Sequence, residues 1–338
     1  MSDDMRWIDV TTLGICGRGW EETDHSYDRL PARAQSQVTP IVWQLSQQSV
    51  GMYVDFTSDT AAIHARCSLR VEQTPEHRYL KYLDLYARDE QHGWRWVGVS
   101  RYGHFPSGET PLIEDLPRQS RQWRLYLPLG YHVDTLSIGI SPDAQITATP
   151  TDTRKPIVIY GTSIVHGMWH VSRPGMAWPS IVGRQLDWPV INLGFSGSAC
   201  MEPDLGQVLS ELDPAVWVID PLANMSLETV IANARAFLLP LCAKHPRTPL
   251  VMMDDRTHEQ AWILPDYAAQ RDAKQAEFRA IAQQLSAEGI RVSYVQGSEL
   301  IGTDGEGTTD GSHPSDLGAY RYAQVMTPVL SRVLYSKA

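Results

Sequence analysis

The chain has 338 residues, which at ~100–200 residues per domain is typical of two domains. Hydrophobic residues make up 43% of it and charged residues 20%, which excludes a disordered, collagen-like or coiled-coil protein. Its 29 basic and 39 acidic residues give a net charge of −10, which argues against a nucleic-acid partner, since such proteins carry basic stripes. The unusual feature is the aromatic composition, with 11 Trp and 14 Tyr against only 5 Phe. Unlike Phe, Trp and Tyr combine a flat ring with a polar group, and such side chains suit amphipathic ligands.

We expect neither a targeting signal nor a membrane-spanning segment in this chain. The first residues are polar and acidic, so we expect no signal peptide. No run approaches ~18 consecutive apolar residues, so we expect no membrane span and no membrane partner. The four cysteines are far apart and lack metal-like spacing, which favours free thiols and no metal site: Cys16, Cys67, Cys200 and Cys242. Together these features predict a cytoplasmic location.

The first 150 residues are patterned as strands. Apolar residues alternate with polar ones over residues 52–56 and 61–69, and the turn residues 57–60 between them predict a hairpin. Taken in chain order, the predicted strands are 38–43, 52–56, 61–69, 79–87, 94–100, 122–127 and 135–140. About seven strands without a convincing helix predict a β-sandwich or jelly-roll domain over residues 1–150.

A second pattern begins at Pro156, after a linker at 149–155. Short continuous apolar runs, typical of buried parallel strands, occur at residues 157–160, 190–193, 216–219, 250–253 and 292–295. Helices are expected between them over residues 227–241 and 265–287, and a last one after Pro314. Strands that alternate with helices predict an open parallel α/β sheet over residues 151–338.

The first of these strands is followed by a segment typical of a serine nucleophile. Ligands of open parallel sheets bind beyond the carboxyl ends of the strands. Ser163 stands two residues after Gly161 at the turn from strand to helix, where its hydroxyl projects from the sheet edge and its N–H can face an anion. Gly-Thr-Ser is also a common turn, so this segment alone leaves a purely structural interpretation open.

The next two strands are followed by groups that can donate hydrogen bonds to a substrate. Gly194 and Gly197 allow a tight turn whose N–H groups point at a ligand, although packing alone also explains them. Asn224 can donate from its side-chain amide, or it can cap the helix that begins near Ser226.

The most informative segment is Asp310-Gly-Ser-His313, which precedes the last helix. An Asp three residues before a His can accept a hydrogen bond from Nδ1–H. This bond fixes the tautomer and leaves Nε2 to face a nucleophile, as a Ser–His–Asp system requires. A surface turn is the alternative interpretation.

In these residues the sequence resembles the SGNH (GDSL-type) hydrolase family. By this resemblance Ser163 is the nucleophile, His313 the general base and Asp310 its orienting acid. The implied oxyanion hole consists of the N–H groups of Ser163 and Gly197 with the Asn224 side chain. Two further segments resemble the branch with an N-terminal β-sandwich and a Gly-x-Asp-Leu-Tyr-like motif: Ser172-Arg-Pro-Gly175 and Tyr82-Leu-Asp-Leu-Tyr86.

The resemblance spans nearly the whole chain. It implies a flavodoxin-like three-layer α/β/α SGNH hydrolase domain, preceded by an antiparallel β-sandwich (jelly-roll-like) domain. Members of this branch are generally regarded as esterases, often placed with carbohydrate deacetylases, and they need no metal or organic cofactor. The chain departs from the family pattern in having Thr162 in place of Asp, Met225 in place of the Asp after Asn224, and Tyr82 in place of Gly.

Residues that flank the nucleophile are candidates for substrate binding. His166, Trp169 and Trp178 can stack on a sugar ring, or they can pack a helix against the sheet. Arg173 can bind a polar or anionic substrate group, or form a surface salt bridge. After the fourth strand, two carboxylates offer an alternative acid or a pair of helix caps: Asp254 and Asp255.

We therefore predict a serine esterase that hydrolyses small acyl esters, above all acetyl esters, of a small molecule or an oligosaccharide through an acyl-Ser163 intermediate. The sequence shows no long apolar lid segment, which disfavours a lipase. Two alternatives stay open: an inactive carbohydrate-binding protein, and an acyl-thioesterase or lysophospholipase with the same site. The sequence also leaves open the sugar, the acyl position, and whether the chain forms a homo-oligomer.

Overall fold

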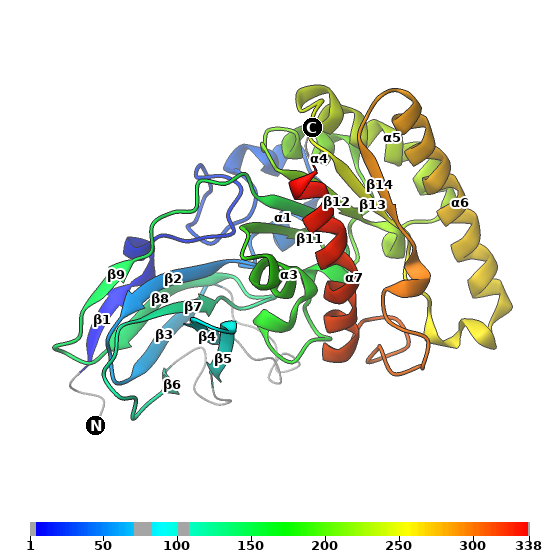
Figure 1. The fold of residues 1–338 in the computed structure, drawn as a ribbon. Helices are drawn as coiled ribbons and strands as arrows, with labels where there is room; N and C mark the ends of the chain where they lie inside the picture. Colours follow the sequence, from blue (N-terminus) through cyan, green and yellow to red (C-terminus); the bar gives the residue numbers. More distant parts are fainter. Residues whose placement is uncertain (1–4, 71–82, 101–107, 337–338) are drawn as a thin grey trace. The chain divides into compact units, whose positions relative to one another are not determined.

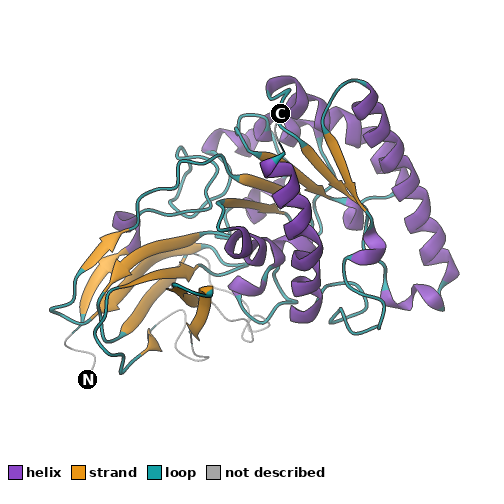
Figure 2. Cartoon of the chain, viewed as in Figure 1, coloured by secondary structure: helices purple, strands orange, loops and turns teal. Residues whose placement is uncertain are grey.

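The structure is a computed structural model that describes residues 5–70, 83–100 and 108–336 (Figures 1 and 2). It divides into two compact units. The first contains Met1–Pro31, Gln47–Thr153 and Ser172–Gly175, and the second contains Ala32–Ser46, Arg154–Val171 and Met176–Ala338. Residues 32–46 therefore belong to the second unit, although the sequence around them belongs to the first. Residues 172–175 belong to the first unit, although the sequence around them belongs to the second.

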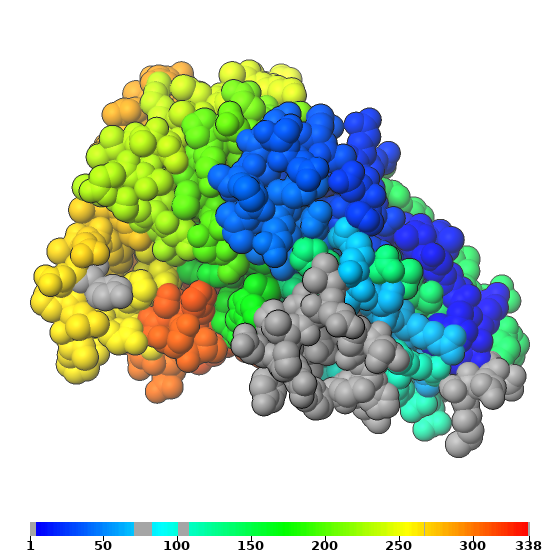
Figure 3. Space-filling model, turned by 180° about the vertical axis from the view of Figure 1, so that it is seen from behind, coloured from blue at the N-terminus to red at the C-terminus, as the bar shows by residue number. Residues whose placement is uncertain are grey.

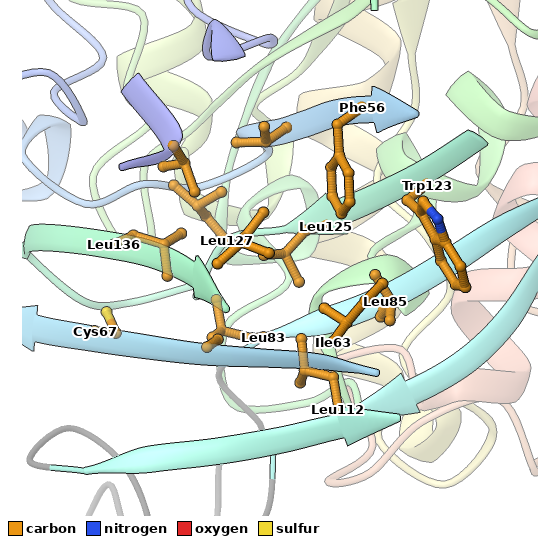
Figure 4. Close-up of a cluster of buried hydrophobic side chains, with 14 of the residues drawn as sticks. Phe56, Ile63, Cys67, Leu83, Leu85, Leu112, Trp123, Leu125, Leu127 and Leu136 are labelled. Atoms are coloured by element: carbon orange, nitrogen blue, oxygen red, sulfur yellow. The ribbon is translucent and has the colours of Figure 1, made fainter. Parts of the chain in front are cut away.

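The described part of the first unit holds nine strands in two antiparallel sheets. One sheet has the order β1 (Arg6–Asp9), β8 (Val133–Ile140), β3 (Ile63–Leu69), β6 (Glu109–Ile113). The other has the order β5 (Gly93–Val99), β4 (Asp84–Asp89), β7 (Arg121–Tyr126), β2 (Tyr53–Ser58), β9 (Ile146–Ala148). Apolar side chains of both sheets form one buried core, which includes Phe56, Ile63, Leu85, Trp123 and Leu136 (Figure 4). The prediction of an antiparallel β domain is confirmed.

Two details of this prediction are wrong. β2 and β3 do not form a hairpin: β2 pairs with β7 and β9, and β3 pairs with β6 and β8 in the other sheet. Alternation shows which side chains of a strand are buried, but it does not select the partner strand. The expected strand at residues 38–43 is instead part of helix α1 (Pro40–Ser46), because a short apolar run fits either structure.

The remaining strand predictions of this unit differ mainly at their ends. The strand expected over residues 79–87 lies partly outside the described residues, and residues 84–87 of it belong to β4. Three strands had no prediction, because each is only three to five residues long: β1, β6 and β9.

The second unit is built on a parallel sheet with the order β11 (Val190–Gly194), β10 (Ile157–Gly161), β12 (Val216–Asp220), β13 (Leu250–Met253), β14 (Val292–Val295). This is the flavodoxin-like strand order 2-1-3-4-5. Helices α3 (Trp178–Leu186) and α7 (Asp316–Tyr335) cover one face (Figure 1). Helices α4 (Pro203–Leu209), α5 (Leu227–Lys244) and α6 (Pro265–Ala287) cover the other. The predicted three-layer α/β/α architecture is confirmed.

Several short helices lie between these longer elements. The four-residue helix α2 (Ser163–His166) follows β10. Within the described residues the 3-10 helices are η1 (Val10–Leu13), η2 (Ala32–Ser36), η4 (Pro174–Met176), η5 (Leu222–Asn224), η6 (Glu259–Trp262) and η7 (Gly297–Glu299). No helix in the described ranges is long and apolar enough to cross a membrane, and the cytoplasmic location stays a prediction.

Candidate active site

Three neighbouring strands of the second unit end level with one another. Gly161, the last residue of β10, pairs with Gly194 of β11 on one side and with Asp220 of β12 on the other. A Cβ at Gly161 would lie 2.6 Å from the Asp220 carbonyl oxygen, so the close approach of β10 and β12 requires glycine there. The loops that leave this common edge carry three of the expected site residues: Ser163, Gly197 and Asn224.

The turn after β10 places the expected nucleophile at the beginning of α2. Thr162 caps this helix by accepting a hydrogen bond from Ile164 N. Ser163 follows as the first helical residue and is largely buried. Its Oγ lies 2.8 Å from His313 Nε2, although the two residues are 150 positions apart in the sequence.

A second hydrogen bond connects the imidazole to the expected acid. His313 Nδ1 lies 2.8 Å from Asp310 Oδ2. Asp310 Oδ1 accepts from the backbone N–H groups of His313, at 2.7 Å, and Ser312, at 3.0 Å. Partial burial alone would raise the pKa of Asp310, but the bonds from His313 and Ser312 outweigh it and lower the pKa to about 2. Asp310 is therefore an anion that holds Nδ1–H, and Nε2 is left to accept from the Ser163 hydroxyl.

Gly197 and Asn224 lie on adjoining loops. Gly197 has φ +70°, and a Cβ there would meet nothing within 4 Å, so its backbone faces open space. Asn224 Oδ1 accepts from Ala199 N at 3.4 Å, which leaves the Nδ2 amide to donate elsewhere. The helix-capping alternative for Asn224 is wrong, because Ser226 caps α5 through a bond from Thr229 N.

A buried cluster of charges supports both the base loop and the Asn224 loop, and sequence reasoning did not find it. Asp255 is paired with Arg256 and with Lys274 Nζ, at 2.8 Å. Arg256 Nε donates to Ser312 O at 2.8 Å, and Lys274 Nζ donates to Leu222 O at 2.6 Å. Burial raises the pKa of Asp255, but Arg256 and Lys274 outweigh burial and lower it. The only hint in the sequence was charged residues directly after a buried strand.

The two carboxylates that follow β13 are structural rather than an alternative acid. Asp255 is held by the cluster just described. Asp254 is paired with Arg279 and accepts from Tyr294 OH at 2.7 Å. Neither is the N-cap of a helix, so the helix-cap alternative is wrong as well.

The structure separates the aromatic candidates for substrate binding. His166 and Trp178 are fully buried, and the Trp178 ring stacks on Tyr322 with 5.7 Å between centroids. A ring that is buried in the core cannot stack on a sugar that arrives from solvent, so for these two residues the packing alternative holds. Trp169 is 49% exposed and has a left-handed backbone with φ +77°.

Arg173 lies within the first unit. Its Nη1 is 2.8 Å from Oδ2 of the fully buried Asp84 and also contacts Tyr86 OH. Its guanidinium lies over the Trp96 ring, 5.3 Å from the centroid. The ion pair between Arg173 and Asp84 is therefore not a surface salt bridge. It connects residues 172–175 to the Asp-Leu-Tyr part of the predicted motif. Tyr82 of that motif lies outside the described residues.

No group of three or more His, Cys, Asp or Glu among the described residues is arranged to hold a metal ion. The four cysteines are free thiols, of which Cys67 and Cys242 are buried and Cys16 and Cys200 are partly buried.

Comparison with known families covers nearly the whole chain. The model of the GDSL-like Lipase/Acylhydrolase family matches residues 154–331. The model of the GxDLY domain, the N-terminus of SGNH-hydrolase-type esterases, matches residues 5–146. None of the curated proteins matches the chain.

Solved structures share this two-part architecture. A protein described as a GDSL-like lipase from Bacteroides ovatus ATCC 8483 is 28% identical, with a TM-score of 0.89 and 98% of each chain covered. The salicylyl-acyltransferase SsfX3 from a tetracycline biosynthetic pathway is 16% identical, with a TM-score of 0.79 over 99% of each chain. The acetyl xylan esterase Est2A from the rumen bacterium Butyrivibrio proteoclasticus is 10% identical, with a TM-score of 0.58 over 98% of each chain.

Proposed function

Because the chain belongs to the GDSL-like lipase/acylhydrolase family and is a carboxylic ester hydrolase, we propose that it is a serine esterase that removes small acyl groups, above all acetyl, from carbohydrate esters. The observation that carries the proposal is the pair of hydrogen bonds from Ser163 Oγ to His313 Nε2 and from His313 Nδ1 to Asp310. These are the contacts that a Ser–His–Asp system uses to activate a hydroxyl.

In the proposed reaction Ser163 Oγ attacks the ester carbonyl carbon while His313 Nε2 takes the hydroxyl proton. Asp310 stabilises the imidazolium that forms. The tetrahedral intermediate collapses, the C–O bond to the alcohol breaks, and His313 returns the proton to the departing alcohol. Water then attacks acyl-Ser163 with His313 again as the base, and the carboxylic acid and the free serine are the products.

The developing oxyanion needs donors that already point at it. We assign this role to the N–H groups of Ser163 and Gly197 and to Asn224 Nδ2. The aligned ends of β10, β11 and β12 support the assignment, because they start the three loops at one edge of the sheet. The Asn224–Ala199 hydrogen bond supports it too, since it fixes the amide beside the Gly197 turn.

Two observations support a carbohydrate ester with a small acyl group. The fold is shared with an acetyl xylan esterase, and the sequence shows no long apolar lid segment. Trp169, which is half-exposed and six residues after Ser163, is the exposed one of the three aromatic candidates, and its exposed face is where a sugar ring would stack.

The nucleophile is tested by Ser163→Ala, with Ser210→Ala as the matched control. Ser210 is also buried, and its Oγ donates only to Gln207 O, at the end of α4. We expect Ser163→Ala to abolish p-nitrophenyl acetate hydrolysis and fluorophosphonate labelling, and Ser210→Ala to keep both. Unchanged turnover in Ser163→Ala would overturn the mechanism.

The substrate class is tested with acetyl, butyryl and octanoyl esters and the matching thioesters, followed by acetylated mono- and oligosaccharides. We expect kcat/KM to be highest for acetyl and to rise further on an acetylated sugar. A preference for octanoyl or for thioesters would instead support the lysophospholipase or thioesterase alternative. Tight glycan binding without turnover would identify an inactive carbohydrate-binding protein.

Acyl transfer to an alcohol is a second candidate, favoured by the structural similarity to a salicylyl-acyltransferase. Product analysis in the presence of a sugar or aromatic alcohol distinguishes the two reactions. Free acid as the main product supports the esterase, and a new ester supports the transferase.

A further inference from the structure

A second imidazole lies between the two loops of the proposed triad. His170 is buried, with 6% of its surface exposed. Its Nε2 lies 2.9 Å from Ser163 O and its Nδ1 lies 2.6 Å from Pro314 O. Its ring also stacks on the His313 ring, with 5.5 Å between centroids and 27° between planes. One side chain therefore contacts the nucleophile residue, the base and the residue that follows the base.

The backbone before His170 is shaped to bring this side chain back to Ser163. Gly167 ends α2 with φ +84°, and Trp169 also adopts the left-handed region, with φ +77°. A non-glycine residue in that region costs free energy and persists only where the surrounding contacts hold it. The two contacts of His170 are such a restraint.

Both partners of His170 are carbonyl oxygens, which can only accept hydrogen bonds. A neutral imidazole has one N–H, so both bonds form together only when the ring is protonated. Burial lowers the pKa of His170, the two carbonyls oppose this, and the titratable groups that act on it from the base loop are His313 and Asp310. In the neutral ring one carbonyl oxygen accepts a hydrogen bond from the single N–H, and the other carbonyl oxygen lies in contact with the second ring nitrogen.

We propose that His170 is a positioning residue that fastens the nucleophile turn to the base loop and so sets the Ser163–His313 distance. The proposal rests on the proposed function, since it assigns His170 to the support of that triad. Small displacements of reacting groups cost about 10²-fold in rate, so loss of this connection affects kcat more than KM.

The test is a set of three substitutions that keep different parts of the imidazole. His170→Phe keeps a ring without donors, His170→Gln places an amide N–H near the Nε2 position, and His170→Asn places one near Nδ1. We expect His170→Phe to lose about 10²-fold in kcat with little change in KM. Each amide that restores a bond should recover about tenfold, as expected for one hydrogen bond.

The matched control is His245→Phe. His245 Nε2 is likewise 2.9 Å from a carbonyl oxygen, that of Ser210, but it lies at the end of α5. We expect this variant to keep wild-type kcat. If His170→Phe stays within about twofold of the wild type, or if Phe, Gln and Asn are all equally impaired, the positioning role is overturned.

The rate of fluorophosphonate labelling at Ser163 separates failure of this proposal from failure of the proposed function. If the wild type is labelled but hydrolyses no ester, the esterase proposal fails, and the labelling rates of the three variants still test His170. If the wild type hydrolyses esters and the variants are labelled at the wild-type rate, only the His170 proposal fails. Should His170→Phe not fold, the Gln and Asn variants carry the same comparison.

Discussion

Arg256 donates from Nε to the carbonyl oxygen of Ser312 across 2.8 Å, and its guanidinium also contacts the Ser312 hydroxyl. Ser312 is the residue before His313, so this buried side chain holds the loop that presents the proposed base. Residues of η6, close to Arg256 in sequence, reinforce the loop, since Glu259 N donates to Gly311 O at 3.0 Å. Figure 3 shows these two surface segments side by side, in yellow and orange.

We predict that Arg256→Lys lowers kcat/KM by about 10–10²-fold. Lysine keeps the positive charge beside Asp255, but it lacks the planar guanidinium that donates to both the carbonyl and the hydroxyl oxygen of Ser312. Arg256→Ala should also destabilise the protein by about 3–5 kcal/mol, since it breaks a buried ion pair. Steady-state kinetics and urea denaturation measure the two effects. Arg279→Lys is the control, because the Arg279 side chain is half-exposed and pairs with Asp254. Full activity in Arg256→Lys would show that the base loop needs no such support.

The Asn224 amide is expected to stabilise the transition state rather than the bound substrate. Asn224→Ala should therefore lower kcat by about 10²–10³-fold and leave KM nearly unchanged. Asn233→Ala is the matched control. Asn233 Nδ2 donates to Cys200 O at 2.9 Å, so Asn233 supports the loop that carries Gly197, as Asn224 does through Ala199, but it has no proposed role in the reaction. An equal loss in both variants would reassign Asn224 to loop support.

The buried Asp220 is predicted to make the second unit less stable as pH rises. Its Oδ2 has no hydrogen-bond partner among the described residues, and burial, helped by the negative charge of Asp255, raises its pKa well above 3.8. Above that pH the unfolded chain releases the proton while the folded chain keeps it. Stability that is present below pH 3.8 is therefore lost as pH rises towards the folded-state pKa, at about 1.4 kcal/mol per pH unit.

Asp220→Asn removes this proton and keeps the shape of the side chain. We expect the variant to gain stability over the wild type at pH 7, and the gain to shrink towards pH 4. Denaturation midpoints at the two pH values measure it. A difference that is the same at both pH values would contradict a protonated Asp220.

In the first unit, Asp84 is expected to be a stability determinant. It is fully buried and accepts from Arg173 Nη1 at 2.8 Å, Gly175 N at 2.8 Å and Trp96 Nε1 at 3.0 Å. Asp84→Asn leaves the Arg173 guanidinium without its counter-charge and should cost about 3–5 kcal/mol of unfolding free energy in the full chain.

Asp89→Asn is the control for this measurement. Asp89 is at the exposed end of the same strand and bonds only neighbouring residues of its own turn, so we expect a change of less than about 0.5 kcal/mol. Equal midpoints for Asp84→Asn and the wild type would show that the Arg173 contacts do not stabilise the unit.

Local patterns predicted the second unit well because its elements are defined locally. A buried parallel strand is a continuous apolar run, and the helix expected over residues 265–287 has those bounds in the structure. Ile231 is an exception: it fits the apolar spacing of α5 but is 59% exposed. The spacing of apolar residues shows which side of a helix faces the core, but it does not show how much of that side is buried. In the first unit, strand partners depend on contacts distant in sequence, and the predicted hairpin failed for that reason.

The sequence by itself determined the family and the short-range part of the candidate site. Asp310 and His313 are three residues apart, and Ser163 follows Gly161 by two, so the turn chemistry that joins each pair is readable in the order of residues. Tertiary structure alone decided what lies beside what over long distances: Arg256 against Ser312, Arg173 on Asp84, and Trp178 in the core instead of at the surface. Burial and long-range hydrogen bonds depend on how separate elements pack, and no local spacing encodes that packing.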